Sequence, residues 1–345
     1  MADGGKPLAG KVALVAGATR GAGRGIAVAL GAAGATVWCS GRTAQGQVGM
    51  PGRPETIEQT VEMVTAAGGQ GIGARCDHTV ETDVEGLVAR IEAESGGLDI
   101  LINDVWGGDD LVDWCKPFWE ADMKTAWALI ERAIFSHMIT ARYATPLLLK
   151  SDRGLIVEIT DGETAGYRGH LLYDLVKSSV IRLAYGMAWD LKATNVTSIA
   201  VSPGYLRSED MLRHFGVTEE TWRDGMKTDP FWEQSETPTF VGRAIAALAA
   251  DPNIRARSGG AYLATHLAHD YGFTDVDGRQ PAFWISIEKM IEDRVAAGGP
   301  VEKDEAGIGA ARYGHIHLDH RRSDQARLYQ ERYRMGDLPA GLRPV

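Results

Sequence analysis

Seven short apolar stretches recur along the chain, and most are followed by a longer stretch with helical periodicity. The apolar stretches lie at residues 11–17, 36–40, 71–76, 98–103, 154–160, 196–202 and 260–264. Apolar positions at helical spacing lie around residues 23–33, 55–67, 80–94, 120–149, 171–193 and 237–250. Short apolar stretches that alternate with helices are typical of parallel strands buried on both faces. The pattern predicts an α/β fold, a doubly wound seven-stranded parallel sheet with helices on both faces.

The alternation of strands and helices changes at two places. Residues 206–237 interrupt it with aromatic residues among charges, and such an insertion is either a substrate lid or a surface helical pair. Beyond residue 270 the chain is polar and rich in arginine and aspartate. We therefore expect one domain over residues 1–270, with 206–237 as its substrate-lid insertion, and a C-terminal extension over residues 271–345. Aromatic residues in the extension favour packing along a neighbouring subunit over a mobile tail.

Composition narrows the class of partner. The chain of 345 residues is 44% hydrophobic with a net charge of −10, which argues against a nucleic-acid-binding surface. It has no signal-peptide pattern and no apolar run of the roughly 18 residues that a membrane span needs. Its cysteines are odd in number and widely spaced, and we expect them to be reduced: Cys39, Cys76 and Cys115. These features predict a cytoplasmic protein with a small-molecule substrate and no membrane or nucleic-acid partner.

One histidine-rich run invites a metal interpretation. It reads HIHLDH at residues 315–320. Because no second group of ligands accompanies it, the run favours a solvated tail or an interface over a metal site. We expect no metal.

A glycine-rich turn follows the first predicted strand, where the first predicted helix begins. It contains Gly17, Gly21 and Gly23 at GxxxGxG spacing. Glycines at this place permit a tight turn and let backbone amides and the helix N-terminus approach a pyrophosphate. The turn therefore predicts a dinucleotide-binding domain of the Rossmann type.

The end of the second predicted strand bears on the choice of dinucleotide. An acidic residue there would bind the ribose 2′-hydroxyl of NAD, whereas an arginine would bind the 2′-phosphate of NADP. The sequence has Ser40-Gly41-Arg42-Thr43 at this turn, and Arg20 lies within the glycine turn. Two arginines and a missing acid favour NADP(H) over NAD(H). If both arginines were ordinary surface charges, the missing acid would stay unexplained.

The order and spacing of several motifs resemble the short-chain dehydrogenase/reductase family across about residues 8–265. The motifs are the glycine turn, Asn103 after the fourth strand, Tyr173-Asp-Leu-Val-Lys177, and Pro203-Gly204 after the sixth strand. Farther on, DPNI (251–254), SGG (258–260) and YGFTDVDGR (271–279) are similar to the branch of the family typified by its dehydrogenase/reductase member one.

The resemblance implies an NADP(H)-dependent oxidoreductase. In the family the tyrosine, here Tyr173, exchanges a proton with the substrate, and the lysine, here Lys177, favours the phenolate and binds the ribose. Residues four apart share one helix face, which permits this pairing. The resemblance also implies adenine contact by Asp77, support of the cofactor loop by Asn103, and approach of Pro203 and Gly204 to the nicotinamide amide. It further implies a homodimer or homotetramer joined through residues 120–149 and 171–193.

Two positions depart from the family pattern. The family's substrate-orienting serine aligns with Asp161, and a shift of one residue would place Thr160 there instead. The family's helix asparagine, part of a water-linked proton relay, aligns with Ile134. An ionised aspartate opposes phenolate formation but stabilises a cation, and a neutral one donates a hydrogen bond. Asp161 is therefore either an acid or a partner of a cationic substrate nitrogen, or it merely caps the following turn.

The leading hypothesis is reduction of a carbonyl or imine in a bulky small molecule of secondary metabolism. Aromatic residues after Asn103 and within 206–237 would wall a large pocket for it. One alternative is a non-redox enzyme of the same fold that catalyses elimination, epimerisation or cyclisation. Another is an NADP-binding sensor that has lost catalysis, although retention of Tyr173 and Lys177 weighs against it.

Overall fold

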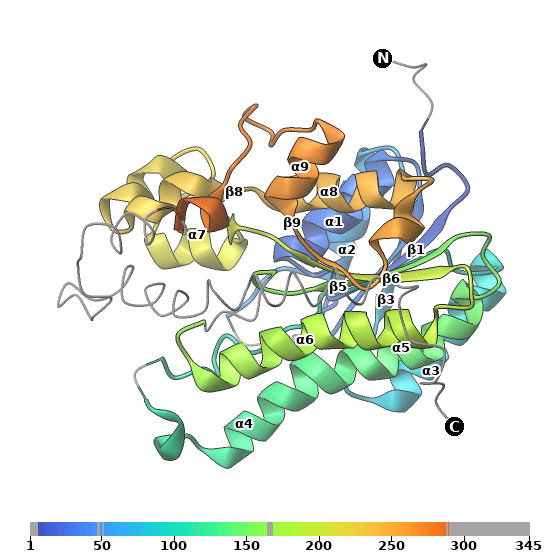
Figure 1. Ribbon diagram of the computed structural model, residues 1–345, viewed down its shortest axis with the longest axis horizontal. Helices are drawn as coiled ribbons and strands as arrows, with labels where there is room; N and C mark the ends of the chain where they lie inside the picture. The colour runs from blue at the N-terminus through green and yellow to red at the C-terminus, as the bar shows by residue number, and fades with distance from the viewer. Residues whose placement is uncertain are drawn as a thin grey trace, which may run out of the picture.

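A parallel sheet forms the middle layer of the fold (Figure 1). The computed structural model describes residues 6–46, 49, 52–114, 116–163, 168–287 and 289. The sheet has the strand order β3-β2-β1-β4-β5-β6-β9, and each neighbouring pair is parallel. The strands are β1 (Val12–Ala16), β2 (Thr36–Gly41), β3 (Gln70–Arg75), β4 (Ile100–Asn103), β5 (Gly154–Ile159), β6 (Val196–Ser202) and β9 (Ala261–Leu263). The predicted doubly wound sheet of the Rossmann type is confirmed.

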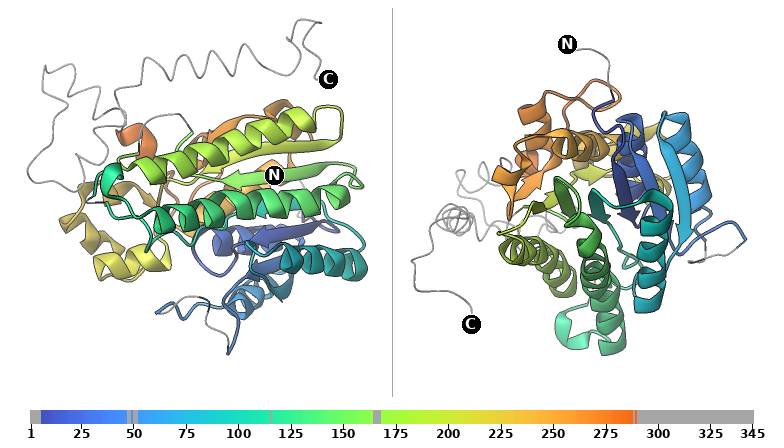
Figure 2. Two further views of the ribbon diagram at one scale, coloured as in Figure 1. Left: turned by 90° about the horizontal axis from the view of Figure 1, so that it is seen from below. Right: turned by 90° about the vertical axis from the view of Figure 1, so that its right-hand side faces the viewer.

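Helices cover both faces of the sheet (Figures 1 and 2). One face carries α1 (Gly21–Ala32), α2 (Ile57–Ala66), α8 (Pro238–Ala250) and α9 (Ala264–Tyr271), and the other carries α3 (Glu81–Ser95), α5 (Ser136–Leu148) and α6 (Leu171–Asp190). Successive strand side chains point to opposite faces. Val15 and Val157 accordingly belong to the apolar core of the first face, and Leu14 and Ile156 to that of the second.

The helix predicted at residues 120–149 consists of several segments. A 3-10 turn, η1 (Phe118–Glu120), precedes α4 (Met123–Ile130), and a π turn, η2 (Glu131–Phe135), joins α4 to α5. A π turn widens the helix by one residue, and apolar spacing does not reveal it. The widened turn lies next to α6, on the side of the sheet where the Tyr173 helix packs.

Residues 205–236 form a small lobe at one end of the sheet, drawn in yellow in Figure 1. Its elements are β7 (Tyr205–Leu206), α7 (Glu209–Phe215), η3 (Trp222–Lys227), η4 (Pro230–Gln234) and β8 (Ser235–Glu236). β7 and β8 pair in parallel as a separate two-stranded sheet. Trp222 and Trp232 are buried, and the indole of Trp232 donates to the Trp222 carbonyl. These two aromatic residues therefore form the lobe's own core.

The start of the predicted C-terminal extension packs onto this lobe. After η5 (Ile254–Arg257), β9 and α9, the chain returns so that Phe283, Trp284 and Ile287 form an apolar cluster with Tyr205 and Phe231. The rest of the extension, including the histidines at 315–320, lies outside the described residues, as does Cys115. Cys39 and Cys76 are buried free thiols.

In the described part of the chain, no helix is long and apolar enough to cross a membrane. Those same residues contain no group of three or more histidine, cysteine or acidic side chains arranged to hold a metal ion.

Candidate active site

A cleft of about 360 Å³ opens at the carboxyl ends of the neighbouring strands β1 and β4, where the strand order reverses. Ligands of doubly wound sheets bind at this kind of switch point. Most site residues predicted from the sequence line the cleft: Gly17, Arg20, Gly21, Arg42, Asp77, Thr160, Asp161, Tyr173, Lys177, Pro203 and Gly204. Gly23 and Asn103 do not line it.

The glycine turn leaves one wall of the cleft without side chains. Gly17 has a φ of +94°, and a Cβ there would lie 2.4 Å from the carbonyl oxygen of Asp104. A Cβ on Gly23 would lie 2.4 Å from the Gly17 carbonyl oxygen. Only glycine fits at either position, because neighbouring backbone occupies the space that a Cβ would need. This cradle fits the phosphates of a dinucleotide.

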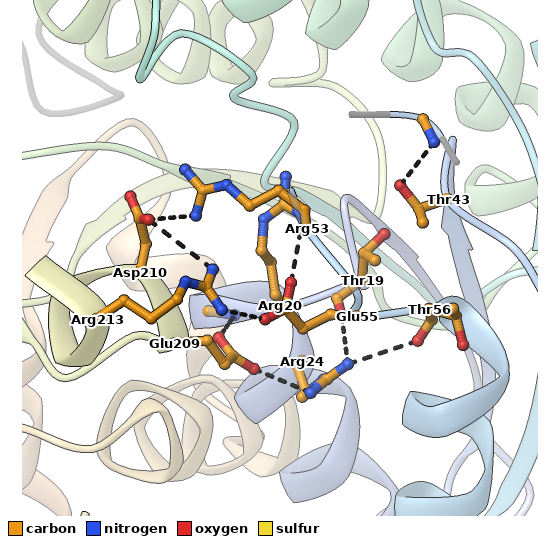
Figure 3. Close-up of polar contacts among 12 residues, drawn as sticks. Thr19, Arg20, Arg24, Thr43, Arg53, Glu55, Thr56, Glu209, Asp210 and Arg213 are labelled. Atoms are coloured by element: carbon orange, nitrogen blue, oxygen red, sulfur yellow. Dashed lines mark hydrogen bonds and ion pairs between the residues drawn. The ribbon is translucent and has the colours of Figure 1, made fainter. Parts of the chain in front are cut away.

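Arginines and carboxylates from three separate segments converge beside this turn (Figure 3). Arg213 of α7 donates to Glu55 at 2.6 Å, and Arg20 lies 3.7 Å from the same carboxylate. Arg53 forms an ion pair with Asp210 of α7. Sequence reasoning anticipated Arg20 but missed the other four residues, because the partners lie far apart in the chain. Burial and the neighbouring Arg53 lower the pKa of Arg20 below its ordinary value.

A carboxylate of α7 lies against the first amide of α1. Glu209 accepts a hydrogen bond from the Gly21 amide at 2.8 Å and pairs with Arg24 at 2.9 Å. A helix N-terminus attracts anions, so Glu209 occupies a favourable anion position at the edge of the cradle. α7 is thereby held close over the glycine turn.

Tyr173 and Asp161 form a direct pair inside the cleft. The Tyr173 hydroxyl donates to Asp161 Oδ2 at 2.7 Å. Asp161 lies just after β5, and Tyr173 lies in the first turn of α6. The acid is therefore placed beside the phenol, where it can accept the phenolic proton or bind a substrate donor.

Thr160 is oriented differently. Its hydroxyl donates to the Lys177 carbonyl at 2.8 Å, which ties β5 to the backbone of α6. Buried Arg168 donates to the Asp161 carbonyl and also to Asp174 at 2.9 Å. These bonds hold the segment so that the side chain of Asp161, rather than that of Thr160, is beside Tyr173.

Lys177 lies one helical turn after Tyr173. Its ammonium is 5.6 Å from the Tyr173 ring centroid and 4.2 Å from the Trp106 ring centroid, a cation–π distance. Burial lowers the pKa of Lys177, while the carboxylates of Asp161 and Asp104 act in the opposite direction. The lysine is thus close enough to stabilise a phenolate by charge.

The position expected for the family's helix asparagine is apolar. Ile134 lies in the π turn η2 and packs in an apolar cluster with Leu129, Val176 and Tyr173. Arg132 from the same turn lines the cleft and donates to the Gly107 carbonyl at 2.9 Å. Arg132 therefore provides a polar contact from the π turn to the loop after β4.

A buried ion pair between Glu158 and His137 supports the loop after β4. Glu158, near the carboxyl end of β5, accepts from Asn103 at 2.7 Å and from His137 at 2.6 Å. The second ring nitrogen of His137 contacts the Val105 carbonyl at 3.0 Å. Burial acts to lower the pKa of His137, but the charge of Glu158 and the hydrogen bond to it raise the pKa above its ordinary value. In the sequence, the signal for this buried group was Glu158, an acidic residue inside an apolar strand.

Asp104 places a second acid close to the reacting end of the cleft. Burial raises its pKa to about 7, although Lys177 and the Gly23 amide act in the opposite direction. Asp104 lines the cleft between the glycine turn and Lys177. Its carboxyl is therefore poised to change protonation near neutral pH.

Aromatic side chains surround Tyr173. The rings of Trp106 and Trp114 lie 5.5 Å and 5.0 Å from it, centroid to centroid. Trp119 is 72% exposed on the loop before α4. Among the aromatic residues expected to wall a pocket, Trp106 lines the cleft. The others do not: Trp114, Phe118, Trp119, Trp222, Phe231 and Trp232.

The fold and this cleft define a dehydrogenase/reductase of the Rossmann type. The chain matches the short chain dehydrogenase family over residues 11–219, and it belongs to that family. Within the family it falls in the branch of dehydrogenase/reductase SDR family member 1. It is 30% identical to that protein of Mus musculus over 286 residues, which cover 81% of this chain and 88% of the relative.

More distant relatives and solved structures agree with this placement. The 7alpha-hydroxysteroid dehydrogenase of Escherichia coli (strain K12) is 28% identical over 205 residues, or 59% of this chain and 73% of that protein. A short chain dehydrogenase structure from Mycobacterium thermoresistibile has a TM-score of 0.67 at 20% identity and covers 80% of this chain and 92% of its own. A putative dehydrogenase structure from Xanthomonas campestris has a TM-score of 0.66 at 24% identity and covers 79% and 94%. At these identities the two structures establish the fold alone.

Proposed function

We propose that the protein is an NADP(H)-dependent oxidoreductase that reduces a carbonyl or imine group of a bulky small molecule, with Tyr173 as the proton donor. The observation that carries this proposal is the Tyr173 hydroxyl inside the cleft, paired with Asp161 and one turn from Lys177. Membership of the family supports an oxidoreductase with a nicotinamide cofactor. We also place the protein in the cytoplasm, where thiols such as Cys39 and Cys76 stay reduced.

In the proposed reaction, the cofactor supplies a hydride and residues of the cleft supply a proton and bind the cofactor. A reduced nicotinamide supplies the hydride for the substrate carbon. Tyr173 donates its hydroxyl proton to the substrate oxygen or nitrogen, and the Lys177 ammonium stabilises the phenolate that remains. Backbone amides of the glycine turn, other than that of Gly21, which donates to Glu209, would hold the phosphates. Arg20 and Arg42 would lie at the ribose and Pro203-Gly204 at the nicotinamide amide.

Asp161 gives the substrate site its particular chemistry. In the family the corresponding residue is a serine, which orients a carbonyl oxygen. Here a carboxylate accepts the Tyr173 hydroxyl, so a substrate has to compete for that acid. A substrate group that donates a hydrogen bond or carries positive charge competes best for the Asp161 carboxylate. This favours a substrate with a basic nitrogen, such as an imine, close to the reacting carbon.

Trp106 and Trp114 favour a bulky, flat substrate. Their rings contact Tyr173 edge-on or tilted, so they flank the place where the reacting group binds. Aromatic edges and faces bind apolar rings over large areas.

The cofactor preference can be tested together with turnover. We expect purified protein to oxidise NADPH in the presence of some members of a panel of ketones and cyclic imines, followed by loss of absorbance of the reduced nicotinamide. Arg42→Ala is expected to raise the Kd for NADPH by about 10- to 100-fold, the range for one charge-assisted hydrogen bond to a phosphate, and to raise that for NADH by less than about threefold.

Arg90→Ala provides a matched control for the loss of a guanidinium. Arg90 is exposed on α3, pairs with Glu94 and does not line the cleft. Equal weakening of NADPH and NADH by Arg42→Ala would contradict the assignment of NADP. Tight NADPH binding without turnover of any substrate would instead favour the sensor alternative.

We further propose that the chain forms a homodimer or homotetramer through α4, η2, α5 and α6. Large apolar side chains on these elements are exposed: Met123, Trp127, Phe135, Met138, Leu171 and Leu175. An exposed apolar surface of this kind is typical of an interface. Sedimentation is expected to show a dimer or tetramer at micromolar concentration. Trp127→Glu should shift it toward monomer, whereas Trp119→Glu, outside these helices, should not. A monomeric wild type would contradict this proposal.

A further inference from the structure

We infer that Glu236 and Trp284 are positioning residues that hold the Pro203-Gly204 turn at the nicotinamide end of the cleft. The lobe strand β8 and the start of the C-terminal extension thereby become part of the cofactor site. The inference rests on the proposed function, in which this turn lies against the nicotinamide amide.

Trp284 holds the carbonyl side of the turn. Its indole nitrogen donates to the Pro203 carbonyl at 3.0 Å, and its side chain is 8% exposed. The neighbouring Phe283 is buried and packs against Tyr205, just after the turn. The contact joins residues 81 apart in the chain.

Glu236 holds the amide side of the same turn. Its Oε2 accepts from the Gly204 amide at 2.9 Å, and its side chain is fully buried. A Cβ on Gly204 would lie 2.9 Å from that oxygen and 3.2 Å from Cβ of Phe283. The turn is therefore packed directly against both segments. Pro203 and Gly204 line the cleft, while Glu236 and Trp284 lie behind them.

The segment that carries Trp284 is anchored independently of the turn. The Ala282 amide donates to Gln234 in η4 at 3.2 Å, and Thr265 of α9 donates to the Pro281 carbonyl at 2.7 Å. These bonds join the segment to the lobe on one side and to the main domain on the other. Because its segment is anchored at both ends, Trp284 can restrict the position of the Pro203-Gly204 turn more than a side chain on an unanchored loop could.

The surroundings of Glu236 favour its neutral form. Burial raises the pKa of Glu236 to about 8, the nearby Asp275 acts in the same direction, and the Gly204 amide and Arg207 oppose them. Arg207 is itself buried and bound to Glu219 at 3.0 Å. Because the folded pKa is raised, the stabilisation from neutral Glu236 is lost as pH rises through about 8.

The test compares two tryptophan variants that each lose one indole-to-carbonyl hydrogen bond. Trp284→Phe is expected to weaken NADPH binding by between about 2-fold and 10-fold, the range for one neutral hydrogen bond. Binding of 2′-phospho-ADP-ribose, which lacks the nicotinamide, should not change. Trp232→Phe loses the corresponding bond to the Trp222 carbonyl within the lobe and should lower the melting temperature without changing the Kd of either ligand.

Glu236→Gln and Glu236→Leu test the acid separately. Glu236→Gln retains an oxygen that can accept from the Gly204 amide, so its Kd for NADPH should stay within about twofold of the wild-type value. Glu236→Leu removes the acceptor and is expected to weaken NADPH binding by between about 2-fold and 10-fold, the range for one hydrogen bond, while binding of 2′-phospho-ADP-ribose should not change.

The outcomes separate the inference from the function on which it rests. If Trp284→Phe weakens the binding of both ligands equally, or of neither, and Glu236→Leu does the same, the positioning role is wrong. If wild-type protein binds neither NADPH nor NADH, the proposed function itself fails.

Discussion

Replacing Tyr173 with phenylalanine is expected to slow NADPH oxidation with the best ketone or imine substrate by about 10³-fold, within the range for loss of a positioned acid. The Kd for NADPH should change by less than about twofold, because the ring and its contacts with Trp106 and Trp114 stay in place. Single-turnover absorbance measurements separate the chemical step from binding. The loss should appear in kcat, since the phenolic proton moves only in the transition state.

Tyr185→Phe is the matched control for the loss of a phenolic hydroxyl. Tyr185 lies on the same helix, α6, but its ring packs against Trp189 and Arg182 and does not line the cleft. Its replacement should leave kcat within about twofold, as expected for a substitution away from the site. Equal activity of Tyr173→Phe and wild type would mean that another group supplies the proton.

Asp161→Asn is expected to lower turnover of the best substrate by about 10²-fold, comparable with removal of one charged or oriented group from a transition-state site. The amide has nearly the size of the carboxylate and retains an acceptor for the Tyr173 hydroxyl, which the acid now binds at 2.7 Å. It carries no charge, so it no longer stabilises the positive charge that develops on an imine nitrogen as Tyr173 donates its proton. The loss should be larger for imines than for ketones, and steady-state kinetics on matched pairs measure this.

Thr160→Val and Asp161→Ser complete the comparison. The Thr160 hydroxyl is bound to the Lys177 carbonyl, so its removal should lower stability more than turnover. Asp161→Ser restores the family's residue type and should shift preference from imines toward ketones. If turnover were unchanged in Asp161→Asn, Asp161 would have no catalytic role and would serve only to cap the following turn. A large kcat loss in Thr160→Val alone would transfer the orienting role to that hydroxyl.

One departure from the family pattern, Ile134, lies in a turn that contacts the loop after β4. Ile134 is apolar where the family has an asparagine, and Arg132 of the same π turn donates to the Gly107 carbonyl of that loop. The loop is also held from below by His137 and Glu158. The loop that carries Trp106 is therefore fixed by charged groups, which supports a rigid wall beside Lys177.

Local features were predictable from the sequence. The inner strands β1, β4, β5 and β6 are buried on both faces, so their apolar residues follow one another in the chain. The glycine turn and the Tyr173-Lys177 spacing each lie within a few residues, and short-range geometry places their groups together. Alignment with the family's serine also predicted that an acid, Asp161, lies at that position. It did not predict the hydrogen bond that Tyr173 donates to this acid.

Contacts between distant segments were decided only by tertiary packing. Arg213 and Glu55 are 158 residues apart, Trp284 and Pro203 are 81 apart, and no periodicity links them. The π turn depends on a change of hydrogen bonding that apolar spacing does not record. The sequence by itself determined the sheet, the glycine cradle and the Tyr173-Lys177 pair, because neighbours in the chain specify them. The charges around the cradle and the support of the Pro203-Gly204 turn came only with the folded chain, because their partners meet through long-range packing.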